Sequence, residues 1–416
     1  MEATFTSIFI TAVVTATAVQ LWLAARQLRH VHEHAQAVPA QFEGRITQSQ
    51  HAKAAAYTIA RVQLGICDLL LAAVLVFVWT LGGALQALSD LWSPYLENPV
   101  AHGVALMMSV FLISALLSIP TEIYGTYGIE RRFGFNRTQP ATYALDTVKK
   151  LALMLLIGVP VAGIILWLMQ HLGSFWWLAA WMVWIAVNLL AVWAFPVFIA
   201  PLFNKFEPLA DAELATRIGA LLERHGFAAN GIFVADGSKR SGHGNAYFTG
   251  LGASKRIVFY DTLLDELNTD EVEAVLAHEV GHFKRKHIAK QLLFSAIVVL
   301  CGLALLAWLA IQPWFYTGLG VTAPNMAIAL LLFMFCAPSF FFFLGPMMSM
   351  MSRKHEYEAD AFAAEQADGA TLVDALVKLY RSNSSTLTPD HLYSAFHDSH
   401  PPAPLRIAHL EGLARS

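Results

Sequence analysis

Residues 270–311 read DEVEAVLAHEVGHFKRKHIAKQLLFSAIVVLCGLALLAWLAI, and two kinds of environment meet within this stretch. The second part, 291–311, is an apolar run of about 20 residues, the length that an α-helix needs to cross a bilayer core. The first part, 270–286, predicts an amphipathic helix, because acidic residues open it and apolar residues recur at helical spacing. Asn268 or Thr269 would cap its start. Three consecutive basic residues at 284–286 end the first part, so the sequence predicts a surface helix that leads into a membrane-spanning helix.

The rest of the chain has the same apolar character. Hydrophobic residues make up 56% of the 416 residues and charged residues only 14%, against about 25% charged residues in soluble globular proteins. This composition excludes a disordered chain, a coiled coil and an ordinary soluble enzyme. Seven runs are long and apolar enough to span a bilayer, namely residues 5–25, 64–85, 104–124, 151–170, 175–199, 291–311 and 326–348. Buried helices of a large soluble protein are the alternative, and seven such lengths in one chain argue against it.

The basic residues are distributed in a way that predicts the topology. All 27 Lys and Arg lie in the loops after spans one, three and five and in the tail after span seven, which a seven-span chain places on one side of the membrane. Cytoplasmic loops carry the excess of Lys and Arg in membrane proteins. We therefore expect these segments in the cytoplasm and the N-terminus outside. The net charge of −3 provides no basic field for a nucleic-acid partner.

The helix predicted at 270–286 carries the pattern HEVGH at residues 278–282. Histidines four residues apart share one face of a helix, so the imidazoles of His278 and His282 can bind the same zinc ion. Glu279 is offset by one residue and can act on a water molecule at the zinc without being a ligand. The pattern therefore predicts one catalytic zinc ion per chain. The alternative is two helical histidines beside a glutamate in a salt bridge, and the well-defined helix around the pattern disfavours it.

A catalytic zinc ion usually takes three protein ligands and a water molecule, so one ligand must come from elsewhere. The run SRKHEYEADAF at 352–362 follows the last span and lies on the same side of the predicted membrane as HEVGH. Glu356 and Asp360 are four residues apart and share a helix face, which suits a ligand and a carboxylate that orients a ligand histidine. His355 and Glu358 compete for the ligand role on pattern alone. A solvated charged helix is the alternative reading of this run.

Further motifs extend the pattern to most of the chain. They are IPTEIYGTYGIERRFGFNR at 119–137, RSGHGNAYFTG at 240–250, EYEADAFA at 356–363, and His400-Pro401-Pro402 followed by Arg406. Together with HEVGH and seven spans, they resemble the integral-membrane zinc endopeptidases typified by the type I CAAX prenyl protease, which belong to the gluzincins. The resemblance implies a mainly α fold, in which a seven-transmembrane helical barrel carries a small cytoplasmic α+β metalloprotease domain.

The resemblance also implies roles for individual residues. It makes Glu356 the third zinc ligand and Asp360 the carboxylate behind the ligands. It makes His400 and Arg406 candidates for stabilising the tetrahedral intermediate or for orienting the site. It assigns substrate binding to Asn245 and to the residues that follow it, Ala246, Tyr247 and Phe248.

Short strands are predicted independently at residues 231–235, 245–250 and 256–260. An exposed strand at 245–250 could pair with an extended substrate, and an ordinary hairpin strand is the alternative. We expect spans one to five in 1–200, the metalloprotease part with the sheet and the HEVGH helix in 201–290, spans six and seven in 291–350, and C-terminal cytoplasmic helices with the third zinc ligand in 351–416.

These observations predict a zinc metalloendopeptidase of the CAAX prenyl protease type, a monomer in a lipid bilayer. Its substrate is a peptide or protein, and the sequence leaves open whether the substrate's C-terminus is prenylated. The alternatives are a quality-control protease for non-prenylated membrane proteins, an inactive zinc-binding scaffold, and a transporter, which Asp68 and Glu122 in the spans would suit. Residues 413–416, LARS, contain no signal for retrieval to the endoplasmic reticulum, which favours a bacterial inner membrane. The membrane of the endoplasmic reticulum is the alternative if the chain is eukaryotic.

Overall fold

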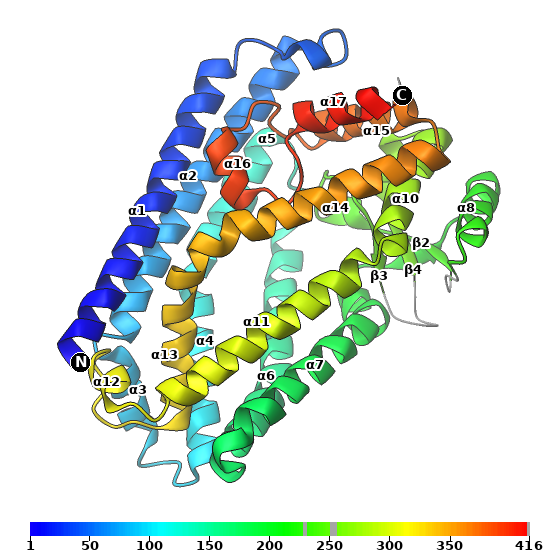
Figure 1. The fold of residues 1–416 in the computed structure, drawn as a ribbon. Helices are drawn as coiled ribbons and strands as arrows, with labels where there is room; N and C mark the ends of the chain where they lie inside the picture. Colours follow the sequence, from blue (N-terminus) through cyan, green and yellow to red (C-terminus); the bar gives the residue numbers. More distant parts are fainter. Residues whose placement is uncertain (228–230, 250–255, 414–416) are drawn as a thin grey trace.

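Seven helices of the computed structural model are long and apolar enough to cross a membrane (Figure 1). The structure describes residues 1–227, 231–249 and 256–413. Each candidate span consists mainly of one α-helix. These helices are α1 (Glu2–His34), α2 (Gln48–Trp79), α4 (Pro99–Ile123), α6 (Pro140–His171), α7 (Trp176–Ala194), α11 (His287–Leu309) and α13 (Met326–Phe341). Each overlaps one of the seven predicted runs, which confirms the predicted number and order of the spans.

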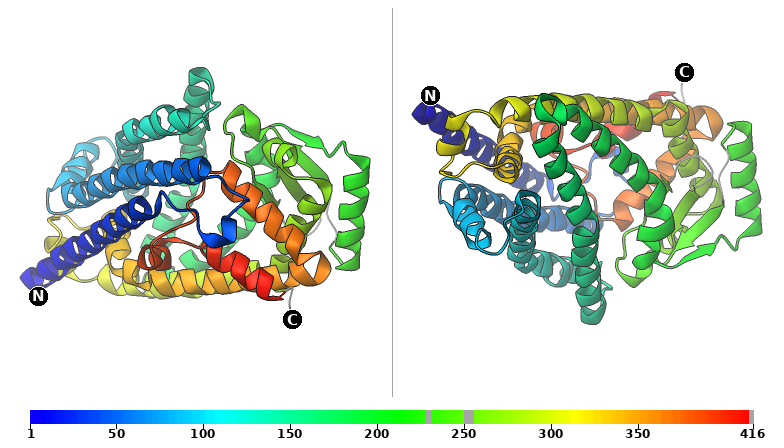
Figure 2. Two further views of the ribbon diagram at one scale, coloured as in Figure 1. Left: turned by 90° about the horizontal axis from the view of Figure 1, so that it is seen from above. Right: turned by 90° about the horizontal axis from the view of Figure 1, so that it is seen from below.

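The spanning helices are arranged in a ring. Each one contacts the next along the chain, from α1 to α13, and α13 contacts α1 and closes the ring. The views in Figure 2 show α1 and α2 side by side, with the N-terminus at the end of the molecule far from the sheet. Apolar side chains from α1, α4, α6 and α13 form the core of the ring. The predicted helical barrel is therefore confirmed.

The second span ends earlier than predicted. The prediction ran from 64 to 85, but α2 ends at Trp79. Thr80 leaves the helical region with φ −94° and ψ −100°, and Gly83 has a φ of +74°, which suits a residue without Cβ. A separate short helix, α3 (Ala84–Trp92), follows this turn. Hydropathy cannot detect the break, because the residues on both sides of it are apolar.

A cavity of about 770 Å³ lies among α2, α4, α6 and the π-helical segment η2 (Tyr124–Glu130) that continues α4. Asp68 and Glu122 line it, together with the basic side chains of Arg61, Lys150 and Arg240. The two acids in the spans are therefore part of the lining of this cavity. The short helix α5 (Arg131–Phe133) follows η2.

A smaller α+β part is built around a four-stranded sheet of order β1-β2-β4-β3. The strands are β1 (Phe206–Pro208), β2 (Ile232–Ala235), β3 (Ala246–Thr249) and β4 (Arg256–Tyr260). The last three match predicted strands, although Gly250 of the predicted strand 245–250 lies outside the described residues. β1 was not predicted, because a three-residue strand that contains proline has no clear alternation. β3 pairs only with β4 within the described sheet and forms its edge.

Helices pack on the sheet and complete the α+β part. They are α8 (Ala212–Arg224), α9 (Asp261–Glu266), α10 (Thr269–Lys284), α14 (Gly345–Gln366), α15 (Gly369–Ser382), α16 (His391–His397) and α17 (Ala403–Leu413), while α12 (Pro313–Thr317) lies between spans. The apolar faces of all of these except α12 and α16 share one core with the sheet, and α16 contacts α14 and α1. The predicted helix 270–286 is α10, and Asn268 caps it in a reciprocal arrangement with Glu271. Residues 414–416 of the C-terminal sequence LARS lie outside the described part of the chain.

Candidate active site

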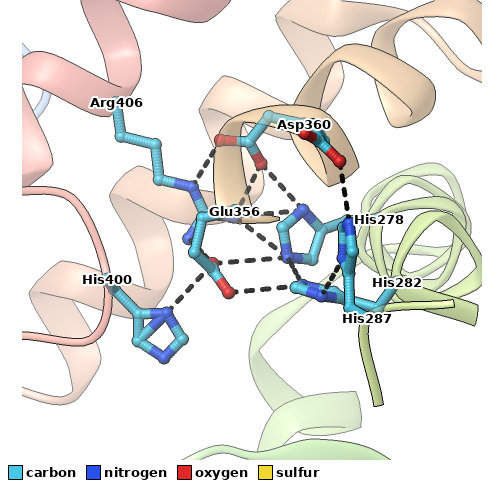
Figure 3. A network of polar contacts seen from close by, with 8 residues as sticks. His278, His282, His287, Glu356, Asp360, His400 and Arg406 are labelled. Carbon is cyan, nitrogen blue, oxygen red and sulfur yellow. Dashed lines mark hydrogen bonds and ion pairs between the residues drawn. The ribbon is translucent and has the colours of Figure 1, made fainter. Parts of the chain in front are cut away.

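Three potential metal ligands from two helices converge at one point (Figure 3). His278 and His282 lie on α10, and Glu356 lies on α14. One nitrogen of each imidazole and one oxygen of the carboxylate all lie within 4.8 Å of one another. HEVGH and the run at 352–362, about 70 residues apart in sequence, therefore meet as the sequence predicted.

A glycine permits this meeting. Gly281 of α10 faces α14, and a Cβ atom built on it would lie 3.0 Å from the Cα atom and 3.1 Å from the carbonyl oxygen of Ala359. Such distances are shorter than ordinary contacts to a Cβ atom, and the atoms in question belong to the backbone. Gly281 thus allows α10 and α14 to pack closely enough for Glu356 to reach the histidines of the neighbouring helix.

The distances between the three donors fit a zinc site. His278 Nε2 lies 3.1 Å from His282 Nε2 and 3.6 Å from Glu356 Oε2, and His282 Nε2 lies 3.3 Å from Glu356 Oε1. Ligand bonds of about 2.0 Å in a tetrahedron place donor atoms about 3.3 Å apart. Two imidazoles and a carboxylate are also a donor set typical of catalytic zinc.

Glu356 is a buried carboxylate, and the described part of the chain does not provide an aligned hydrogen bond to both of its oxygen atoms. Its side chain is 6% exposed, and its Oε2 atom accepts no aligned hydrogen bond in the described part of the chain. His400 Nδ1 lies 2.9 Å from Oε2, close enough for an ion pair when that histidine is protonated. A buried oxygen without a hydrogen-bond donor is costly unless a cation approaches it. This oxygen is therefore the observation on the carboxylate side that fits a metal.

Asp360 and Arg406 support the site from behind. The Asp360 carboxylate lies 2.8 Å from His278 Nδ1 and accepts two hydrogen bonds from the Arg406 guanidinium, at 2.7 and 2.8 Å. Burial by itself lowers the pKa of a guanidinium, but the bonds to Asp360 raise the pKa of Arg406 above its ordinary value. Arg406 therefore remains charged and fixes the carboxylate that contacts His278.

The predicted general base has no competing partner. Glu279 follows His278 on α10 and is partly exposed. Within the described ranges, its carboxylate takes part in no hydrogen bond or ion pair. A carboxylate that follows a candidate ligand in the chain and is not otherwise engaged is free to accept a proton from a water molecule.

The two rivals of Glu356 lie on another side of α14. Glu358 accepts a hydrogen bond from His287 Nε2 at 3.0 Å, and the His355 ring stacks on the His287 ring with centroids 4.1 Å apart. Neither belongs to the converging group. His287 was not predicted as a site residue, because it lies beyond the end of α10, where helical spacing no longer applies.

The predicted substrate-binding residues form a separate feature at the edge of the sheet. Asn245 is exposed and precedes β3, and its carbonyl oxygen accepts a hydrogen bond from the Tyr260 backbone at 2.9 Å. Ala246, Tyr247 and Phe248 form the strand itself and are partly buried. Burial raises the pKa of Tyr247 to about 12. These residues contribute no atom to the network of Figure 3, which leaves their predicted role to be tested.

Two family models match the chain. The model of the CAAX prenyl protease N-terminal region, with five membrane helices, matches residues 27–205, and the model of peptidase family M48 matches residues 208–414. CAAX prenyl protease 1 of Saccharomyces cerevisiae is 35% identical over 341 residues, which cover 76% of this chain and 74% of the yeast protein.

The chain belongs to peptidase family M48.

Other members of the family resemble this M48 peptidase over most of their length. A CAAX prenyl protease 1 homolog of Homo sapiens is 30% identical over 376 residues, which cover 81% of this chain and 78% of the human protein. The crystal structure of S. mikatae Ste24p superimposes with a TM-score of 0.91 at 31% identity and covers 97% of this chain and 98% of that chain. The ring of helices and the α+β part are thus features shared with a solved relative.

Family membership defines the class of enzyme. This M48 peptidase is a multi-pass membrane metalloendopeptidase that acts on a peptide or protein substrate, and the family implies a metal, generally zinc. The predicted family, fold class and enzyme class are therefore confirmed. The transporter and the inactive scaffold are not favoured.

Proposed function

We propose that this M48 peptidase holds one zinc ion with His278, His282 and Glu356 and cleaves peptide bonds near the C-terminus of CAAX-type substrates. The convergence of these three donors within 4.8 Å carries the proposal. Asp360 orients His278 through its Nδ1 atom, and Arg406 holds Asp360. The ligand set thus has a charged support that is buried with it.

The side chains around the donors suit hydrolysis. When bound, zinc polarises the scissile carbonyl and lowers the pKa of a water molecule from about 15.7 to about 7. Glu279 takes the proton of the attacking water and passes it to the leaving amine. His400 lies beside Glu356 with its side chain 66% exposed, so it can donate a hydrogen bond to the oxygen that becomes negative in the transition state. Arg406 is buried, and its bonds to Asp360 favour an orienting role.

The substrate is proposed to pair with the edge of the sheet. β3 has no neighbour on one side within the described sheet, and an extended peptide can add there as a further strand. Asn245 would bind the peptide backbone where it enters, and Ala246, Tyr247 and Phe248 would line it. His243 lies shortly before this strand. Its Nε2 atom is 3.3 Å from Oε2 of Glu130, which connects this part of the chain to η2.

The proposed substrate class rests on the relatives. The yeast and human proteins are named as CAAX prenyl proteases, and the match to this chain covers more than two thirds of the length of each. The cavity of about 770 Å³ in the ring lies beside η2 and gives room within the membrane part of the molecule. We propose a prenylated C-terminus as the preferred substrate. The positive-inside rule supports an active site on the cytoplasmic side and an N-terminus outside.

Paired peptides test the function directly. Purified full-length protein is given a farnesylated CAAX peptide and the same peptide without the lipid, with and without a zinc chelator. Wild type should cleave the farnesylated peptide in a zinc-dependent manner. Glu279→Gln should retain one zinc ion per chain and lose about 10²- to 10⁴-fold in kcat, the usual contribution of a general base.

Each alternative has its own outcome in this experiment. Full activity of Glu279→Gln would remove the proposed mechanism. Equal cleavage of both peptides would favour a protease for non-prenylated substrates. Bound zinc without cleavage of either peptide would favour a scaffold.

A further inference from the structure

His287 lies directly behind one of the proposed zinc ligands. Its Nδ1 atom is 3.0 Å from Nδ1 of His282, the ring nitrogen that does not face the metal point. Its Nε2 atom is 3.0 Å from Oε2 of Glu358. The His287 side chain is 4% exposed, whereas Glu358 is 30% exposed. A continuous line of contacts therefore runs from His282 through the buried His287 ring to the partly exposed carboxylate of Glu358. Figure 3 shows the first two members, His282 and His287.

The chain makes a specific turn to place this ring. α10 ends at Lys284, and Lys286 adopts a left-handed conformation with a φ of 55° before α11 begins at His287. Residues with a side chain rarely adopt this conformation. His287 is the first residue after this turn, and its ring contacts His282 of α10.

The hydrogen bonds have one consistent direction if His282 binds a metal. Its Nε2 atom must then be free of a proton, so its Nδ1 atom carries the proton and donates to Nδ1 of His287. Since that nitrogen accepts, the neutral His287 ring carries its proton on Nε2 and donates to Glu358. Every donor in this line meets an acceptor, and no further proton is needed.

The other proposed ligand, His278, also has a carboxylate behind its ring, but without an intervening histidine. His278 Nδ1 lies 2.8 Å from the Asp360 carboxylate, so a carboxylate stands directly behind that ring. Behind His282 the carboxylate of Glu358 acts through His287. Carboxylates that accept from a ligand histidine fix its ring orientation and raise its basicity.

We propose that His287 and Glu358 are positioning residues that fix the His282 ring and tighten zinc binding. This inference rests on the proposed zinc site. Glu358 is further held by Lys354 and Lys290, whose Nζ atoms lie 3.9 and 4.0 Å from it. His355 covers the other side of His287 by stacking, with an interplanar angle of 12°. The ring is thus restrained on its face and at both nitrogens.

The test measures zinc affinity and not activity. Purified full-length variants are titrated against a competing zinc chelator, and the visible spectrum of the cobalt-substituted protein is recorded. His287→Phe keeps the stacking on His355 but has no acceptor for His282, and Glu358→Ala removes the terminal acceptor. Each should weaken zinc binding by about 10- to 100-fold and change the cobalt spectrum. Melting temperatures at saturating zinc show whether the variants are folded.

Three matched variants separate this role from packing and charge. His287→Asn keeps an acceptor near the Nδ1 position but loses the link to Glu358, and it should match Glu358→Ala. Glu358→Gln keeps an acceptor for His287 and should stay within about 3-fold of wild type, since the amide oxygen can accept the same bond. Glu365→Ala removes an exposed acid on the same helix that has no partner in the described chain, and it should bind zinc like wild type.

The proposal is overturned if folded His287→Phe or Glu358→Ala binds zinc as tightly as wild type. It is also overturned if Glu365→Ala weakens binding as much as Glu358→Ala, because net charge would then explain the effect. A wild-type protein that binds no zinc would instead overturn the metal site, so the two failures are distinguishable.

Discussion

Arg406 and Asp360 form a buried ion pair in contact with a proposed zinc ligand. Their side chains are 8% and 0% exposed, and two parallel hydrogen bonds join them. The guanidinium presents two N–H groups in the plane of the carboxylate, which a lysine ammonium cannot do. The geometry at this residue pair therefore depends on arginine and not only on positive charge.

Replacing Arg406 tests this dependence. Arg406→Lys keeps the charge but loses one of the two bonds, so we expect a loss of about 1–3 kcal/mol in unfolding free energy and weaker zinc binding. Thermal unfolding and chelator competition measure the two effects. The control is Arg381→Lys, where the partner is Glu266 and the arginine is 38% exposed, and a loss below about 1 kcal/mol is expected. Similar losses in both variants would contradict a special role for Arg406.

Some site residues could be assigned from the sequence, and others could not. The pair His278 and His282 follows from helical spacing alone. Glu356 could not be separated from His355 and Glu358 on pattern, because the three lie within one turn and the contact between two helices decides which one faces the histidines. His287 escaped prediction because the spacing rule does not extend across the left-handed turn at Lys286.

At the scale of helices, the contact between α10 and α14 depends on Gly281. Gly281→Ala places a methyl group 3.0 Å from the Ala359 backbone, so α14 must move and Glu356 must move with it. We expect a loss of about 1–3 kcal/mol in stability from overpacking, together with lower zinc affinity. Gly302→Ala in α11 is the control, because the nearest atom to its added Cβ is 3.8 Å away. Unchanged zinc affinity in Gly281→Ala would show that the helices tolerate the wider spacing.

At the scale of strands, the edge β3 offers a second test. Tyr260 donates its backbone N–H to the carbonyl oxygen of Asn245. In an antiparallel strand, the backbone N–H and C=O groups of successive residues point to alternate edges of the strand. The backbone N–H of Tyr247 therefore points to β4, and that of Ala246 points to the free edge. Ala246→Pro removes one outward N–H group and should lower kcat/KM about 5-fold, the effect of one hydrogen bond of about 1 kcal/mol. Its melting temperature should stay near that of wild type.

Tyr247→Pro is the matched comparison, because it removes an N–H group from the ladder with β4 and should lower the melting temperature. If Ala246→Pro retained full kcat/KM, the substrate would not pair with β3.

For the whole molecule, the distribution of charge predicts which side faces the cytoplasm. Ser93 and Glu213 are both exposed and lie on opposite sides of the predicted topology. In a chain whose three cysteines are replaced by serine, a membrane-impermeant maleimide should label Ser93→Cys in intact cells. It should label Glu213→Cys only after permeabilisation. Labelling of Glu213→Cys in intact cells would reverse the orientation.

The ring and the cavity show the limits of hydropathy at this scale. The number and order of the spans follow from seven apolar runs and the position of Lys and Arg. The closure of the ring by α13 against α1 is a tertiary contact between the first and last spans, which no local pattern contains. The cavity is invisible for a similar reason, because the residues that line it come mainly from α2, α4, α6, η2 and the segment around Arg240, which are far apart in sequence.

The route of the chain between the two ligand helices limits how the protein can be dissected. α10 leads through two residues into α11, and α14 follows α13 after a single short turn, so both membrane helices lie between His282 and Glu356. Any excised fragment that contains His278, His282 and Glu356 must therefore include the two membrane-spanning helices α11 and α13. A water-soluble catalytic core cannot be obtained by trimming the termini, and biochemical work on the centre requires an amphiphile or a bilayer from the start.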